Sequence, residues 1–229
     1  MFTTKASSIA RAAAMLLAVP LVGCGSPGAA VSTPAATLAP STLASEIALV
    51  DSDVGRGTTV SLIPKGDRVK GQMTMNNCGY TFTTESHRIA RLQVEILAPQ
   101  GQHTGASNEV AVYDTAEQAA KAMNEFRMSV KNCKKTVFHK SGEAGVPKVR
   151  YAFETVASAK DLPVKDTAVS TMVVRFKGMK LRMYLELIYQ RQGRVISGVY
   201  LQQPIKPTKA DKAILRIMAL ATGKRLAAN

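Results

Sequence analysis

Two kinds of hydrophobic periodicity alternate along the chain after residue 46 and predict strands and helices. Residues 58–63 are a short β-branched run that ends at a Pro-Lys-Gly-Asp turn. In residues 88–97, Leu92, Val94 and Ile96 alternate with polar neighbours, which is the period of a half-buried strand. Another short strand is expected at 108–113, after a loop at 102–107.

The last third of the chain predicts an antiparallel meander. Glycine-bearing turns at Gly178 and Gly193 separate its later segments. In residues 180–191 apolar side chains alternate with polar ones, so one face is expected to pack in the core and the other to be largely exposed to solvent. The expected strands are 149–157, 168–177, 180–191 and 194–202.

A first amphipathic helix is predicted after Asp114, which stands three residues before Glu117 as in a capping box. Its apolar residues follow one another at spacings of four, three and four, which places them on one helix face. They are Ala119, Met123, Phe126 and Val130. Cys133 continues the same stripe, so its thiol is expected to face the sheet.

A second helix is predicted to begin after Pro207, with Thr208 and Asp211 spaced as a capping box, and to end near Gly223. Its apolar stripe is expected to lie on the inner face of the meander. The stripe consists of Ile214, Ile217, Met218 and Ala221. The predicted fold class is α+β, a mainly antiparallel sheet with helices packed on one face.

The first 24 residues have the order of an export signal. Lys5 and Arg11 precede an apolar run over 12–21, and small residues follow. The run is too short to span the ~30 Å core of a bilayer as a helix. Residues 21–24, Leu-Val-Gly-Cys, resemble the lipobox of bacterial lipoproteins, in which cleavage precedes a cysteine that receives a diacylglyceryl group. We expect a signal peptide at 1–23 and a lipid on Cys24; an ordinary cleaved secretory signal is the alternative.

A flexible tether is expected between this anchor and the domain. Residues 25–45 consist almost entirely of Gly, Ser, Ala, Thr and Pro, which cannot bury enough apolar surface to order the chain. As a random coil, the lipid-anchored linker at 24–45 would span about 25 Å. Residues 46–229 remain for one globular domain.

The cysteine count is three, at positions 24, 78 and 133. A lipidated Cys24 leaves Cys78 and Cys133 as a pair, and exported chains meet oxidising conditions, so a disulfide is expected. Two independent buried thiols, the alternative, are more typical of a cytosolic protein.

The chain is strongly basic, with 30 Lys and Arg against 16 Asp and Glu and a net charge of +14. Such an excess on an exported domain favours contact with anionic envelope lipids or polymers, and no nucleic acid is expected there. A solvated basic face without a partner is the alternative. The candidate anion-contacting residues are Arg88, Arg91, Lys180 and Arg182.

The sequence lacks the motifs of several common enzyme classes. It contains no G-x-S-x-G, S-x-x-K, H-E-x-x-H or phosphate-loop pattern. Its three histidines are far apart, and none has another histidine or a cysteine at metal-ligand spacing. Asp51-Ser52-Asp53 lacks the rest of a calcium loop and is interpreted as a turn or cap. We expect no catalytic residues, no metal and no cofactor.

Several landmarks together resemble actinobacterial lipoproteins that contain a PknH-type extracellular sensor domain. The resemblance covers roughly residues 46–205 and includes the helix that leads to Cys133. It implies an extracytoplasmic sensor-like module that binds a ligand, with no established catalytic residues to carry over. The chain departs from the kinase's domain in lacking tryptophan and a second cysteine pair. The landmarks are residues 48–55, 77–82, 88–94, 107–110 and 113–120.

These patterns favour a lipid-anchored, non-catalytic ligand-binding or sensor-like domain on the outer face of the cytoplasmic membrane. An unknown protein partner would have to carry any signal onward, because only a tether connects the domain to its anchor. The alternative is a carrier of a lipid or acylated molecule between membrane and envelope, which needs an internal apolar cavity of several hundred Å³. A hydrolase of unrecognised geometry is a third possibility.

Overall fold

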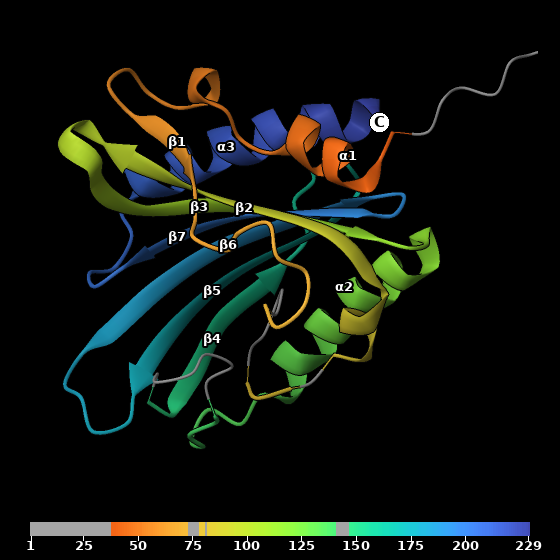
Figure 1. Ribbon diagram of the computed structural model, residues 1–229. Coiled ribbons are helices and arrows are strands. Elements are labelled where there is room, and N and C mark those ends of the chain that lie inside the picture. Colours follow the sequence, from red (N-terminus) through yellow and green to blue (C-terminus); the bar gives the residue numbers. More distant parts are fainter. Residues whose placement is uncertain (1–37, 73–77, 81, 141–146) are drawn as a thin grey trace, which may run out of the picture. The chain divides into compact units, whose positions relative to one another are not determined.

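A seven-stranded antiparallel sheet forms the centre of the domain (Figure 1). The computed structural model describes residues 38–72, 78–80, 82–140 and 147–229. The predicted signal peptide, Cys24 and the first part of the tether lie outside these residues. The strands are β1 (Thr59–Leu62), β2 (Arg88–Ala98), β3 (Gln102–Tyr113), β4 (Val149–Ala157), β5 (Asp166–Phe176), β6 (Arg182–Gln192) and β7 (Val195–Gln203).

The sheet consists of two meanders joined side by side, in the order β1-β2-β3-β7-β6-β5-β4. The last strand, β7, pairs antiparallel with β3, and Val110 lies opposite Ser197. This junction places β3 and β7 inside the sheet and leaves β1 and β4 at its edges. The predicted meander of the last third is confirmed, with strand ends shifted by at most two residues.

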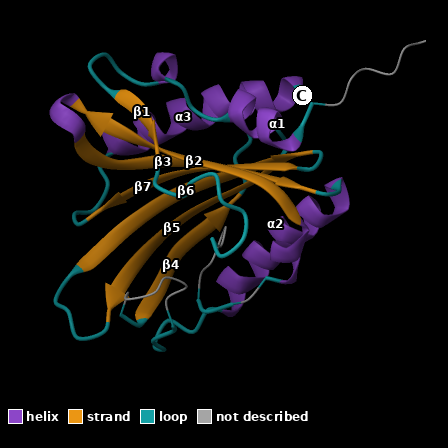
Figure 2. Cartoon of the chain, in the orientation of Figure 1, coloured by secondary structure: helices purple, strands orange, loops and turns teal. Residues whose placement is uncertain are grey.

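Helices cover both faces of the sheet (Figure 2). On β3, Ala111 and Tyr113 pack against α2, whereas the alternating Val110 and Val112 pack in the core with α1. The α+β class and the antiparallel sheet are confirmed, but the helices do not share one face. The regular helices are α1 (Pro40–Ile47), α2 (Ala116–Asn132) and α3 (Lys209–Ala228), and the short 3-10 turns are η1 (Asp51–Asp53), η2 (Thr83–His87) and η3 (Pro99–Gly101).

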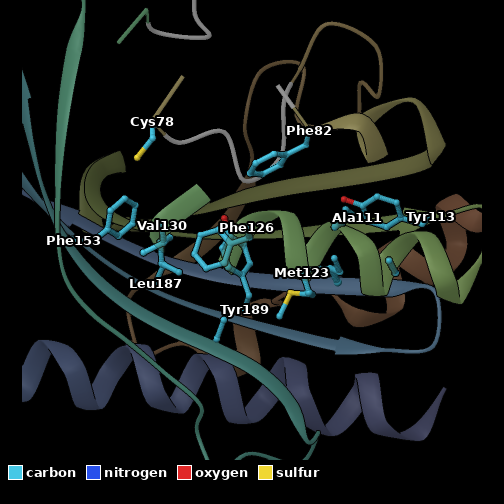
Figure 3. Packing of buried hydrophobic residues seen from close by; sticks show 14 of the residues in the cluster. Cys78, Phe82, Ala111, Tyr113, Met123, Phe126, Val130, Phe153, Leu187 and Tyr189 are labelled. Carbon is cyan, nitrogen blue, oxygen red and sulfur yellow. The ribbon is translucent and has the colours of Figure 1, made fainter. Parts of the chain in front are cut away.

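The core beneath α2 contains the helix stripe that the periodicity predicts (Figure 3). Phe126 packs edge-on against Tyr189 of β6, with ring centroids 4.8 Å apart. At the end of α2, Cys133 forms a disulfide with Cys78, the pair that the cysteine count predicts. The disulfide joins this helix to the segment that leads into η2.

On the other face, α1 and α3 lie over the junction of the two meanders. Leu215, Met218 and Ala219 of α3 pack against Ile188 and Val199. Leu43, Ala44 and Ile47 of α1 share the neighbouring core with Leu226. No described helix is long and apolar enough to cross a membrane.

Several predicted boundaries differ from the structure. The domain begins earlier than residue 46, because α1 buries Leu43 and Ala44 within the stretch predicted as tether. Residues 102–107, predicted as a loop, are the first half of β3 and pair with β2. The N-cap of α2 is Thr115, whose hydroxyl accepts from the Gln118 amide, and not Asp114.

The phase and length of α3 also differ from expectation. The capping box of Thr208 and Asp211 is confirmed, but the helix continues past Gly223 to Ala228. A Cβ at Gly223 would lie 2.4 Å from Gln190 Oε1, so this glycine permits close packing on β6 and does not end the helix. Met218 is buried as predicted, whereas Ile214 and Ile217 face solvent.

Candidate functional site

The most unusual feature of the domain is a set of charged and phenolic side chains that are buried or half-buried on the α2 face of the sheet. Buried charges are rare in proteins unless they are paired. We call this set the arginine–tyrosine network. Its members are Glu85, Arg88, Arg91, Glu109, Tyr189 and Tyr200.

Glu109 of β3 is the centre of the network, and its side chain is 5% exposed. Arg91 Nε on β2 donates to Glu109 Oε1 at 2.5 Å, and Arg88 Nη1 lies 3.8 Å from the same oxygen. The Arg91 side chain is 4% exposed. Glu109 and Glu85 together carry two negative charges against the two positive charges of Arg88 and Arg91, so the site is close to electrical balance.

Both arginines also hold the loop after β1, residues 63–72, which we call the strap. Arg91 Nη1 donates to the Gly66 carbonyl at 3.0 Å. Arg88 Nη2 donates to the Val69 carbonyl at 2.8 Å and also to the Gln72 carbonyl. A Cβ at Gly66 would lie 2.4 Å from the Gln93 carbonyl oxygen, so only glycine lets the strap lie this close to β2.

Two tyrosines extend the network across the sheet. The Tyr200 hydroxyl lies 3.4 Å from Glu109 Oε2 and 3.1 Å from the Tyr189 hydroxyl. Gly198 makes this arrangement possible, because a Cβ there would lie 2.6 Å from the Tyr189 ring and 2.7 Å from the Tyr200 hydroxyl. Burial raises the pKa of both phenols well above its ordinary value. At neutral pH they are therefore uncharged hydrogen-bonding groups.

A hollow of about 650 Å³ borders the network on the side of the strap. Its volume lies within the range of small-molecule sites. Arg88 and Glu85 form part of its wall, and their side chains form an ion pair of 2.8 Å. The other lining residues are 69–72 of the strap, Ser86 and Ile89. The hollow thus combines aliphatic surface with charged groups.

Tyr113, at the end of β3, is fully buried beneath α2. Its hydroxyl has no hydrogen-bond partner among the described residues. Burial raises the pKa of this phenol, with a further contribution from Glu85. A buried hydroxyl without a partner costs about 1–3 kcal/mol.

The four basic residues predicted to contact anions do not form one surface. Arg88 and Arg91 are brought together, but both are buried in ion pairs. Lys180, in the turn before β6, and Arg182, the first residue of β6, are exposed, and Arg182 lies over the Tyr184 ring. By register Arg91 is level with Ala111, Ile196 and Arg191, at the opposite end of β6. Binding of an anion by any of them stays a prediction.

Sequence reasoning did not identify the strap, Glu109 or the tyrosines as parts of one site. The alternation in β2 assigns Arg91 to a polar face, and only the tertiary structure covers that face. The glycines at 66 and 198 are the sequence signal that could have indicated close packing. Among the described residues, no group of three or more His, Cys, Asp or Glu side chains could hold a metal ion.

Comparison with known proteins identifies a shared fold. Neither a protein-family model nor a curated protein matches the sequence. Among solved structures, the extracellular domain of PknH from Mycobacterium tuberculosis is similar, with a TM-score of 0.51 and 12% sequence identity. The similarity covers 82% of this chain and 97% of that domain. At this identity the two share a fold, in agreement with the fold that the resemblance implies.

Proposed function

We propose that this chain is a lipid-anchored, non-catalytic extracytoplasmic domain that binds a ligand. The observation that carries the proposal is the fold likeness over nearly all of a domain that is itself extracellular. The export-type N-terminus, the lipobox-like residues 21–24 and the disulfide agree with it. Cys24 is the proposed anchor.

We place the ligand in the hollow between the strap and β2. Ile89 and Val69 supply aliphatic contacts, and the exposed residue Lys70 adds a positive charge to the wall. The network behind this wall fixes the strap through Arg88, so the site is held by buried ion pairs. This arrangement suits a small molecule with an apolar body and a negative charge.

Binding is tested by mass spectrometry of the protein purified from its own cell envelope. We expect an extra mass under native conditions that is lost on denaturation. Ile89→Trp, which fills the hollow, should abolish the extra mass, whereas Leu181→Trp at the far end of the sheet should retain it. A bare mass for the unsubstituted protein would contradict ligand binding. An acyl-chain mass would favour the carrier alternative.

The anchor is tested separately by metabolic labelling with a fatty acid. We expect label on the unsubstituted chain and none on Cys24→Ser. Label that persists on Cys24→Ser would place the lipid elsewhere and would contradict this part of the proposal.

A further inference from the structure

The outward face of α3 is apolar where a solvated helix is normally polar. Ile214 and Ile217 are 54% and 57% exposed, although both are large aliphatic residues. The buried side of the helix is complete without them, because Leu215, Met218 and Leu226 already pack on the sheet. Neither isoleucine therefore packs in a core formed by the described residues.

Small residues extend this apolar surface along the helix. Ala210 and Ala213 are exposed one turn before the isoleucines, and Lys224 is exposed two turns after Ile217. Spacings of three, four and seven residues place these side chains on one helix face. A face of this kind, rimmed by lysine, is typical of helices that lie in a membrane interface.

The charge of α3 favours an anionic partner. The helix contains five basic residues and a single acidic one, Asp211, which is held in the capping box. Arg216 and Arg225 pair with acidic residues of neighbouring segments. Lys209 and Lys224 are exposed and form no ion pair with a described residue. Two copies of this face would bring like charges together, which disfavours self-association through it.

The entry point of the chain favours a membrane as the partner. The described part begins at Leu38, directly before α1, and α1 lies on the same face of the sheet as α3 (Figure 1). The segment between Cys24 and Leu38 would span about 20 Å as a random coil. An anchor at Cys24 would thus keep the α1–α3 side of the domain close to the bilayer.

We propose that the outward face of α3 docks on a bilayer with anionic headgroups. Ile214 and Ile217 enter the boundary between headgroups and acyl chains, and Lys209 and Lys224 contact lipid phosphates. The inference rests on the proposed membrane anchor, and it adds a defined orientation in which the opposite, α2 side of the domain faces away from the membrane.

The absence of tryptophan from the chain provides a direct test. In residues 24–229, with the disulfide formed, Cys24 is the remaining thiol and can be coupled to a maleimide lipid in vesicles. This coupling supplies the anchor chemically, whether or not Cys24 is lipidated in cells. Ile217→Trp then reports on the face, and Leu181→Trp, at a site 46% exposed on the β5–β6 turn, is the matched control.

On vesicles with phosphatidylglycerol, we expect the Ile217→Trp emission to shift to the blue and to be quenched by brominated acyl chains. The Leu181→Trp emission should stay unchanged, and 0.5 M salt should weaken the effect because headgroup contacts are screened. In the uncoupled chain, Ile214→Ser with Ile217→Ser should lower vesicle affinity about tenfold.

Unquenched emission from Ile217→Trp on coupled vesicles would overturn the proposal, and so would equal quenching at both sites. A concentration-dependent blue shift without vesicles would assign the face to a second copy of the chain and would also overturn it. Because the coupling is chemical, these outcomes do not depend on the fatty-acid labelling that tests the anchor.

Discussion

At the scale of single residues, Glu109 has the largest expected effect on stability. Glu109→Gln removes the charge that compensates Arg91 and Arg88 in a buried site. We expect the free energy of unfolding to fall by about 3–5 kcal/mol, because a buried charge loses its partner. Urea denaturation at pH 7 measures this change.

The matched control is Glu95→Gln on the neighbouring strand β2. Glu95 pairs with His103, whose side chain is largely exposed, so its loss should cost less than about 1 kcal/mol. Equal losses of unfolding free energy for the two variants would show that burial does not increase the contribution of the Glu109 ion pairs to stability.

The buried hydroxyl of Tyr113 gives a second prediction at this scale. Tyr113→Phe removes a polar atom without a described partner, so stability should stay constant or rise by up to about 1 kcal/mol. Tyr200→Phe, which loses its contacts with Glu109 and Tyr189, should lower stability by about 1 kcal/mol. Thermal unfolding of both variants measures the contrast. A loss of stability for Tyr113→Phe as large as for Tyr200→Phe would mean that the Tyr113 hydroxyl has a hydrogen-bond partner.

At the scale of elements, Asp166 connects three of them. Arg127 of α2 and Arg191 of β6 both donate to this carboxylate at the start of β5. Burial alone would raise the pKa of Asp166, but the hydrogen bonds from the two arginines outweigh it, and the pKa lies below the ordinary 3.8. The bonds therefore stabilise the fold above about pH 4, and this contribution is lost as the pH falls through the lowered pKa.

Asp166→Asn should lower the free energy of unfolding at pH 7 by about 2 kcal/mol. The difference from the unsubstituted protein should shrink as the pH falls below about 4 toward the lowered pKa of the native carboxylate. Urea denaturation from pH 3 to pH 7 measures both effects. Asp161→Asn, at a more exposed pair with Arg216, is the control and should change stability little. A pH-independent difference for Asp166→Asn would contradict the assignment.

Whether an element can be predicted from the sequence depends on how local its pattern is. The α2 stripe and the last meander are predicted correctly, because their periodicities are strong and local. The first half of β3 is missed, because its polar side chains carry little strand preference and pairing with β2 and β7 decides its structure. In α3, isoleucines on the outward face hide the phase of the buried stripe.

The candidate site is less predictable for a related reason. Arg88 and Arg91 are recognisable in the sequence, but their burial depends on the strap and on Glu109, which lie 16 to 26 residues away along the chain. Long-range contacts of this kind leave no local pattern, apart from the glycines that permit close approach.

At the scale of the whole molecule, the disulfide closes a loop with a sequence separation of 55. Cys78→Ser with Cys133→Ser should lower the free energy of unfolding by about 4 kcal/mol, because the unfolded chain gains conformational freedom. Urea denaturation with and without reductant measures the effect. Cys24→Ser is the control and should leave stability unchanged; an undiminished stability in the double variant would contradict the prediction.

The pairing of β3 with β7 also determines when, during synthesis or export, the seven-stranded sheet can be completed. A chain appears N-terminus first, so β3 is complete at Tyr113 but waits for β7, which begins at Val195. Until then β3 and β6 both present free edges, which are prone to pairing with other chains. A nascent chain arrested before residue 195 should therefore be sensitive to protease and to aggregation, and the released chain, which contains both β7 and α3, should be protected.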